Sequence, residues 1–584
     1  MLHRLLLLAL ILLALLLPFE LDRPWLQLGT LVLTNVEVML WLVLTLAAAH
    51  WWQAGRPRLP VPSLWAGLLL FFLAALFLSA MLAPDFPLNA FKAAMRTVLG
   101  VALALAVSLT VQTPRHLHLL VAALVIGGLA AALVGIAELV YGGSFDWLSP
   151  LRVTPTNVGP FLRLTGSFDY ANQAAMFFEA TLPLLLAFCW RARMRRKRQL
   201  IFLLLLALLY AQAVILTFSR TSFITLLLVN MGLALLLALP SRFGERRLAG
   251  HAHRPLALLA ASLALFMLLL IAANSLLNPV FRLRFSNGSD NDWYQVHFDV
   301  PDRLDLESGQ QKRVPITVTN NGVFTWQTGG NQAINLAARW VQPESGRELS
   351  DRPHWPLPGP VAPGETVTLQ VSLQAPQPEG EYRLVWDMVQ ENVIWFGART
   401  GQETSSLITV SAASASERPQ TPAPAAGAEE QSDLFEPRWS YQAPIPNRLT
   451  LWRAAAQLWQ ERPLLGVGLD NFRLLYGRPL GFEAWNPSIH SNNWLVETVV
   501  SVGLLGSLPF LLWLGLLATD LVRQLRRPDV NIWQWALAAG LMTYLVHGLL
   551  DYFLMFYATG LLFWMLVGLW LPATRKVAWQ EETG

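Results

Sequence analysis

Long apolar runs separated by short polar stretches make up most of this chain. Most of the runs are roughly 17–25 residues long, the length of an α-helix that crosses a lipid bilayer. We count about twelve of them, near residues 4–19, 30–50, 62–83, 91–111, 116–140, 173–190, 200–217, 221–239, 255–277, 491–519, 531–550 and 554–571. The pattern predicts an α-helical polytopic membrane protein with about 12 transmembrane helices.

The long gap between the ninth and tenth runs has a different pattern. From about residue 286 to residue 412, short segments alternate apolar and polar positions, as in TVTLQVSLQ (366–374) and EYRLVWDMV (381–389). Turn sequences such as Asn320-Asn321-Gly322 separate them, and such spacing is typical of an all-β, Ig-like sandwich. Its tryptophans either fill the core or stack on sugars, and we expect core positions.

Two further segments complete this gap. Residues 413–440 are rich in Pro, Ala, Ser and Glu, a composition that predicts a flexible linker. Helical periodicity returns at 448–461, where Leu449, Trp452, Ala456 and Trp459 share one face. This short amphipathic helix is expected to lie along the outer membrane surface.

These patterns divide the chain into five parts. They are an N-terminal membrane domain of about nine helices (1–277), the inserted sandwich (278–412), the linker (413–440), an outer loop with the amphipathic helix (441–490) and a C-terminal membrane domain of about three helices (491–584).

The distribution of charge predicts an orientation for the helices. Basic residues cluster in the connections at 56–58, 191–198, 242–247, 523–527 and 575–576. All five clusters fall on one side if the runs alternate and the N-terminus is inside. The positive-inside rule then predicts a cytoplasmic (inner) membrane protein with both termini cytoplasmic and residues 278–490 extracytoplasmic. The clusters are explained by topology, so nucleic acid is not an expected partner.

Composition removes several other classes of function. The single cysteine, Cys189, excludes an intrachain disulfide. The chain has no C-x-x-C or H-E-x-x-H spacing and no G-x-x-x-x-G-K-[ST] motif. We therefore expect no metal site, no cofactor and no ATP hydrolysis.

The first candidate for chemistry is the point where a polar segment enters the tenth apolar run, NPSIHSNNWLVETVVSVGLLG (486–506). A helix that begins here directs unpaired N–H groups and the positive end of its dipole toward an anion. His490 either acts as a general base, donates a hydrogen bond to an anion, or caps the helix. Asn493 is a good capping residue. Glu497, seven residues after His490, either orients that histidine or pairs with an arginine.

The second candidate is Arg220, in the tight Ser219-Arg220-Thr221 junction between two apolar runs. A charge so close to the membrane is costly and normally has a partner or a function. The alternative is an arginine that snorkels to the interface and anchors the end of its helix.

Four passages together resemble a known family. They are RLTGSFDYANQAA (163–175), FSRTSF (218–223), NRLTLWRAAAQLWQERPLLGVGLDNF (447–472) and IHSNNWLVETVVSVGLLG (489–506). In this order, with the many runs and a large outer loop before the tenth, the membrane part resembles the O-antigen ligase and polymerase superfamily, whose shared region is often called the Wzy_C domain. The inserted sandwich departs from the shorter outer loop of that family.

The resemblance implies a GT-C-like fold and metal-independent, inverting glycosyl transfer. The donor would be a glycan on an undecaprenyl-diphosphate carrier, and the reaction would take place at the outer face of the cytoplasmic membrane. The key residues carried over by motif are His490, Arg220 and Arg448, with Arg453 as the alternative loop arginine.

The positions of further residues, at the ends of apolar runs and in turns, make them candidates for substrate binding. Arg163 and Asn172, which flank the sixth run, bind diphosphate or sugar, or else anchor the interface. Gly466 and Gly468 let the backbone approach the carrier, or simply end a helix. Asn493 and Glu497 complete the expected set.

Several functions remain open at this point. A ligase transfers the glycan to a lipid or protein acceptor, whereas a polymerase uses a second carrier-linked repeat unit. A transporter of lipid-linked glycan also needs many membrane helices, and a surface receptor would bind through its sandwich. Membrane lipids are expected partners in every case.

Overall fold

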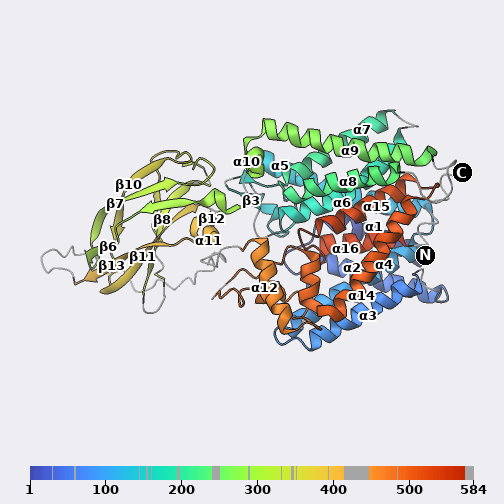
Figure 1. Cartoon of the computed structure of the whole chain (residues 1–584), viewed down its shortest axis with the longest axis horizontal. Helices are drawn as coiled ribbons and strands as arrows, with labels where there is room; N and C mark the ends of the chain where they lie inside the picture. The colour runs from blue at the N-terminus through green and yellow to red at the C-terminus, as the bar shows by residue number, and fades with distance from the viewer. Residues whose placement is uncertain are drawn as a thin grey trace.

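The computed structural model is mostly helical, with a β region at one end of a helix bundle (Figure 1). It describes residues 1–28, 31–57, 61–143, 145–152, 156–159, 161–193, 197–239, 250–286, 290–330, 332–343, 348–349, 352–391, 393–412, 446–482 and 485–571. The predicted linker, 413–440, lies outside the described residues.

Each of the predicted apolar runs contains a helix. The bundle consists of α1 (Leu2–Leu16), α2 (Asn35–Gln53), α3 (Ser63–Met81), α4 (Pro87–Thr110), α5 (Pro114–Tyr141), α6 (Ala171–Ala192), α7 (Lys197–Leu216), α8 (Arg220–Ala238), α9 (Gly250–Leu277), α14 (Trp494–Leu525), α15 (Ile532–His547) and α16 (Tyr557–Trp570). Short elements join them: β1 (Leu26–Leu28), β2 (Leu31–Leu33), η1 (Asp146–Leu148), β3 (Asn157–Val158), β4 (Phe161–Leu162), α10 (Pro279–Ser286), α12 (Arg448–Glu461) and α13 (Phe472–Leu475).

Eight helices in the described part of the chain are long and apolar enough to cross a membrane: α3 to α9 and α14. Two more, α1 and α16, are apolar but only 15 and 14 residues long. A helix rises about 1.5 Å per residue, so these two fall short of a bilayer core of about 30 Å. Membrane insertion is therefore compatible with the structure, and the number of crossings stays a prediction.

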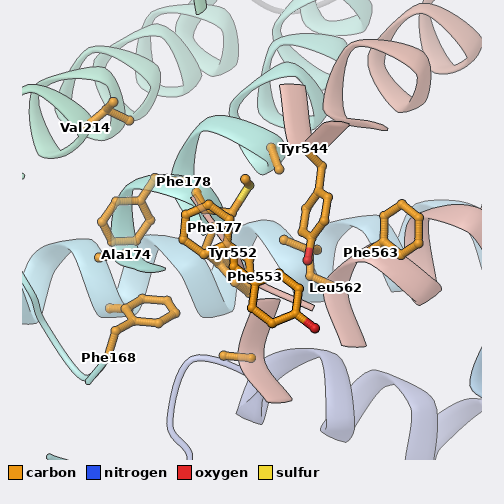
Figure 2. Close-up of a cluster of buried hydrophobic side chains, with 14 of the residues drawn as sticks. Phe168, Ala174, Phe177, Phe178, Val214, Tyr544, Tyr552, Phe553, Leu562 and Phe563 are labelled. Carbon is orange, nitrogen blue, oxygen red and sulfur yellow. The ribbon is translucent and has the colours of Figure 1, made fainter. Parts of the chain in front are cut away.

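The two predicted membrane domains pack into one another. Helix α14 lies against α3, α15 against α6, and α16 against α4. Helix α6 is enclosed by neighbours, which is why its apolar positions surround it instead of forming one stripe. Figure 2 shows the aromatic core at this junction, with Phe177 and Phe178 of α6 on one side and Tyr544 of α15 and Phe563 of α16, whose rings are in contact, on the other.

The β region contains two sheets, and Figure 1 shows them at the end of the molecule away from the N-terminus. A three-stranded sheet has the order β10-β7-β5, and a six-stranded sheet has the order β6-β13-β11-β8-β9 with β12 paired to β11. Neighbouring strands are antiparallel except β13 and β6, which are parallel. The strands are β5 (Val296–Asp299), β6 (Arg303–Glu307), β7 (Gln311–Asn320), β8 (Ile334–Val341), β9 (His354–Pro356), β10 (Thr366–Gln374), β11 (Gly380–Gln390), β12 (Ile394–Trp395) and β13 (Thr404–Ser411), with η2 (Asp290–Tyr294) and α11 (Phe396–Thr400) at the edge.

Alternation of side chains builds the core of this region. Val314, Ile316 and Val318 of β7 are buried, whereas Thr317 and Thr319 face out and pair with threonines of β10. The largest buried side chains are tryptophans, Trp293, Trp326, Trp340 and Trp386. These tryptophans therefore occupy the core, as expected, and are not available to stack on sugars.

The β region begins later than the predicted boundary at residue 278. Residues 279–286 form α10, which belongs to the helical body. Phe281 of α10 packs against Phe218 and Phe223 at the junction of α7 and α8, with ring centroids 5.8 and 5.6 Å apart. The alternating pattern of the sandwich starts only beyond this helix.

Helix α14 is broken one third of the way along, at Gly503, whose φ is +58° and ψ −164°. The chain segment 463–468 lies in this break and supplies its hydrogen bonds. Val467 N–H and Gly468 N–H donate to the carbonyls of Val500 and Ser501, while Leu504 N–H donates back to Pro463. The break therefore leaves these backbone groups paired, as an apolar environment requires.

We predict that this close contact makes Gly466 essential for stability. Gly466 has φ +68°, and a Cβ there would lie 2.5 Å from the carbonyls of Val500 and Ser501. Gly481 has φ +70° but no atom within 4 Å of its Cβ position. The variant Gly481→Ala therefore measures the cost of the backbone conformation without any steric contact. Gly481→Ala should cost about 1 kcal/mol and Gly466→Ala about 3 kcal/mol. Thermal unfolding in detergent measures both, and equal shifts for the two variants would contradict the contact.

Candidate functional site

His490 lies in a turn immediately before α14. The side-chain oxygen of Asn493 caps this helix by accepting from the N–H groups of Leu495 and Val496, at 2.8 and 3.1 Å. His490 is only 8% exposed, and its Nδ1 lies 3.5 Å from Oε1 of the fully buried Glu497. This separation is that of an ion pair. The other carboxylate oxygen of Glu497 accepts from the N–H of Ser491 at 2.9 Å and so fixes the turn that carries the histidine.

The surroundings of His490 favour its protonated form. Burial by itself lowers the pKa of His490, but the carboxylate of Glu497, with a smaller contribution from Asp470, raises that pKa above its ordinary value. Arg473 opposes this effect weakly. His490 is therefore charged over a wider pH range than an exposed histidine, and a cation beside Glu497 can donate a hydrogen bond to an anion.

The connection between α15 and α16 joins His490 to a second group of polar residues. The imidazole packs on the rings of Tyr552 and Phe556, with centroids 5.4 and 5.8 Å away. Next to Tyr552, the carboxylate of Asp551 accepts a hydrogen bond from Asn172 Nδ2 at 2.9 Å. Tyr552 also belongs to the aromatic core beneath the site (Figure 2). The 548–556 segment thus spans the distance between the histidine and α6.

Arg163 is the next member of this chain of contacts. Its Nη2 donates to Oδ1 of Asn172 at 2.8 Å, and its Nε donates to the carbonyl of Thr217 at 2.7 Å. Thr217 precedes Arg220 by three residues, and Arg220 is the first residue of α8, where Ser219 caps the helix. The two hydrogen bonds hold the guanidinium of Arg163 beside the start of α8.

A cluster of five arginines, from five separate segments, forms around this point. Burial lowers the pKa of Arg284, and the positive charges of Arg163, Arg220, Arg399 and Arg448 lower it further. Burial likewise lowers the pKa of Arg163, and Arg220 and Arg399 add to this effect, whereas Asp551 opposes it. Arginine remains charged at any physiological pH. The shifts therefore report burial first and repulsion from neighbouring arginines second, and a bound anion would relieve that repulsion.

The structure separates the two arginines proposed for the outer loop. Arg448 is the first residue of α12, after the capping side chain of Asn447, and its charge reaches Arg284. Arg453 lies five residues further along the same helix, and both side chains are exposed. The indole N–H of Trp452 donates to the carbonyl of Ser491 at 2.9 Å, which ties α12 to the turn of His490. Helix α12 therefore connects the arginine cluster to the histidine.

Three of the expected binding residues have structural partners instead of an open position. Gly466 and Gly468 allow close approach, but the approach is to the break in α14. Asn493 uses its side-chain oxygen to cap α14 and its Nδ2 to bind the carbonyl of Leu549 at 2.8 Å. The remaining candidates, apart from Arg453, lie along the chain of contacts from His490 to the arginines.

Sequence reasoning missed Arg284 and Arg399, and it gave Asp551 no role beyond a local polar pair with His547, whereas Asp551 pairs with Asn172 and His547 with Glu179. Arg284 and Arg399 lie in α10 and α11, outside the four motif passages, so no local pattern distinguishes them. Asp551 had a usable clue, because a carboxylate beside an apolar run needs a partner. In the described residues, no group of three His, Cys, Asp or Glu side chains is arranged to hold a metal ion.

Comparison with known proteins identifies one part of the chain. Residues 299–402, most of the β region, match the family model described as an Ig-like domain from next to BRCA1 gene. No curated protein matches the chain. Among solved structures, the Pseudomonas fluorescens alkylpurine DNA glycosylase AlkC bound to DNA containing an abasic site analog is similar at 12% identity, over 60% of this chain and 100% of that one, with a TM-score of 0.14. That score is too low to carry an argument about fold or function.

We predict that the pH dependence of stability reveals the contact between Glu497 and His490. Because the folded-state pKa of His490 is raised, its stabilising effect is complete below about pH 6.5 and is lost as pH rises through the folded value. Glu497→Gln keeps an acceptor for Ser491 but leaves the histidine to burial and to the weaker, opposing charges of Asp470 and Arg473. The difference in thermal midpoint between wild type and variant should be largest below about pH 6.5 and should shrink toward pH 9.

The control is Glu391→Gln, which removes the carboxylate beside a histidine that is partly exposed to water. His354 Nδ1 lies 2.9 Å from Glu391, and both side chains are about a third exposed. Glu391→Gln should change the thermal midpoint little at any pH, because exposed ion pairs are weak. A constant difference for Glu497→Gln across the pH range would mean that His490 is neutral in the folded protein.

Proposed function

We propose that this chain is a membrane glycosyltransferase of the O-antigen ligase type. It transfers a glycan from an undecaprenyl-diphosphate carrier to an acceptor at the outer face of the cytoplasmic membrane. The observation that carries the proposal is the convergence of five arginines, which the contacts of Asn172, Asp551 and Tyr552 connect to the buried pair of His490 and Glu497. A lipid diphosphate is an anion with two or more negative charges. It lies at the membrane surface, where an apolar bundle meets water.

Arginine suits the stabilisation of a diphosphate leaving group. Its planar guanidinium grips phosphate oxygens through two parallel hydrogen bonds. Negative charge grows on the diphosphate as the bond to the sugar breaks, and donors already fixed in place stabilise that charge without reorganising. Arg220, Arg163 and Arg448 are assigned this role, with Arg163 held in place by Asn172 and the carbonyl of Thr217.

The raised pKa of His490 favours one of its two roles. A general base must be unprotonated before it removes the proton of an acceptor hydroxyl. The carboxylate of Glu497 instead keeps a proton on the imidazole. We therefore assign His490 as a hydrogen-bond donor to the departing diphosphate, with Glu497 as the residue that positions it.

The proposed topology follows from the arrangement of the elements. The β region and the N-terminus lie at opposite ends of the helical body (Figure 1), which suits an N-terminus inside and a β region outside. About twelve crossings on a GT-C-like plan, with an Ig-like sandwich inserted between α10 and α12, complete the proposal. Ligase and polymerase differ in the acceptor, which is a lipid or protein for the first and a second repeat unit for the second.

One observation favours a second candidate, a transporter of lipid-linked glycan. Transporters often bind their cargo at broken membrane helices, and α14 is broken at Gly503. The segment 463–468 and the hydroxyl of Ser79 already pair with the backbone at this break. These contacts occupy the carbonyls of Val500 and Ser501, which a transporter would use to coordinate an ion or substrate, and we prefer the transferase.

The direct test uses the full chain in lipid nanodiscs, with undecaprenyl-diphosphate glycan, candidate acceptors and excess chelator. Wild type should transfer glycan. His490→Ala and Arg220→Lys should each lose about a hundredfold in rate, because each removes a donor to the leaving group. Lysine keeps the charge of Arg220 but lacks its fork of donors. Product length distinguishes ligase from polymerase, and movement of intact carrier glycan across the bilayer without transfer would establish the transporter.

A second prediction separates the two arginines of α12. Arg448→Ala should reduce transfer about a hundredfold, because Arg448 lies within reach of the arginine cluster. Arg453→Ala should change the rate less than about threefold, because Arg453 lies more than one helical turn beyond the start of α12, where the charge of Arg448 reaches Arg284. The same assay measures both, and the reverse order of effects would reassign the loop arginine to Arg453.

A further inference from the structure

The β region docks on the helical body through η2. The indole of Trp293 lies over Gly159, where an added Cβ would be 2.5 Å from the ring, so the glycine creates the space for this contact. Phe161 of β4 meets the same indole edge-on, with centroids 6.3 Å apart, and the hydroxyl of Tyr294 donates to the carbonyl of Gly159 at 3.2 Å. Strand β4 ends at Leu162, so the docking point lies immediately before Arg163 in the chain.

Helix α11 is fixed beside this docking point. The ring of Phe396 packs on Tyr294 and on Trp326, with centroids 5.1 and 5.9 Å away. The carboxylate of Asp387 in β11 accepts the N–H of Gly397, 2.9 and 3.1 Å from its two oxygens, and holds the first turn. Arg399 is carried by the last turn. Figure 1 places α11 and β12 at the end of the β region that faces β3 and the bundle.

Both docking segments act on residues of the candidate site. After burial, the charge of Arg399 contributes to the lowered pKa of Arg163 and of Arg284. The carboxylate of Asp292, in η2, lies within electrostatic range of Arg220. The β region therefore brings one cation and one carboxylate to the site.

Other arginines of the β region behave differently. Arg339 and Arg352 pair with Glu348, and Arg383 lies 3.7 Å from Glu403, all within the β region. These three arginines therefore have acidic partners within the β region itself. Arg399 is distinguished from them by its place at the interface, beside a cluster of other arginines.

We propose that the β region is part of the substrate site, and that Arg399 binds the diphosphate of the donor together with Arg163 and Arg284. The inference rests on the proposed function, which identifies the anion. Arg399 supplies guanidinium N–H donors to phosphate oxygens and takes no part in bond making or breaking. The charge of Asp292 acts on Arg220 and positions it in the same site. The site is complete only when the inserted region is docked, so the insert is a component of the site and not a spacer.

The test measures binding of inorganic diphosphate to the full chain in nanodiscs by calorimetry. Arg399→Ala should weaken binding about tenfold or more, because it removes charge-assisted hydrogen bonds to the anion. Arg399→Lys should fall between wild type and Arg399→Ala, since it restores charge without the fork. Arg383→Ala, an arginine of the same β region that faces Glu403, is the matched control and should bind as wild type does.

The outcomes separate the two proposals. If Arg163→Ala weakens binding but Arg399→Ala does not, the role of the β region is overturned and the arginine site stands. If neither variant weakens binding, the anion site itself fails. Thermal unfolding of each variant checks the fold, and Arg399→Gln, which keeps much of the side chain, replaces Arg399→Ala if alanine lowers the midpoint by more than Arg383→Ala does.

Discussion

The burial of charge at one end of an apolar bundle is the constraint on which the rest of this structure depends. A charged group removed from water needs an opposite charge or fixed hydrogen bonds, or its cost is several kcal/mol by general estimates. Glu179 meets His547, Glu138 meets Arg152, and Glu497 meets His490, each acid being fully buried. The arginine cluster adds like charges to this end of the bundle, because Arg163, Arg220, Arg399 and Arg448 all lower the pKa of Arg284. The fold brings these like charges together, which is the arrangement that we propose for binding an anion.

The contacts that hold this cluster come from parts of the chain that are far apart in sequence. Asn172 links Asp551 to Arg163, and Trp452 links α12 to the turn of His490. The β region adds α11 through the seating of Trp293 on Gly159. No single segment contains the site, so its geometry is a property of the folded bundle together with its insert.

Hydropathy was sufficient to predict the helices and alternation was sufficient to predict the strands. Both patterns arise from local burial, and each predicted run holds the expected element. Residue spacing also placed Glu497 near His490, although for a different reason than expected. His490 lies outside the helix, and a turn through Asn492 at φ +53° brings it back over the first turn of α14. The boundary near 278 was early, because α10 is helical.

Two features left no trace in the local pattern. The break at Gly503 lies among residues that are apolar on both sides, and its partner segment is about 40 residues earlier. Arg284 and Arg399 join the site only through tertiary packing of α10 and α11, which a single sequence does not reveal. These are also the two residues through which, in our proposal, the β region and the helical body form one site.

The mutual repulsion of the arginines has a consequence for turnover. An empty cluster is the least favourable state of such a site, and any polyvalent anion that fills it lowers the free energy of the protein. For a diphosphate donor, the charge on the leaving group is greater after the sugar has departed than before. Under the proposed function, the spent carrier would then be held more tightly than the loaded one. Release of the product, rather than the chemical step, would limit the rate, and removal of spent carrier from the membrane would be a means of controlling it.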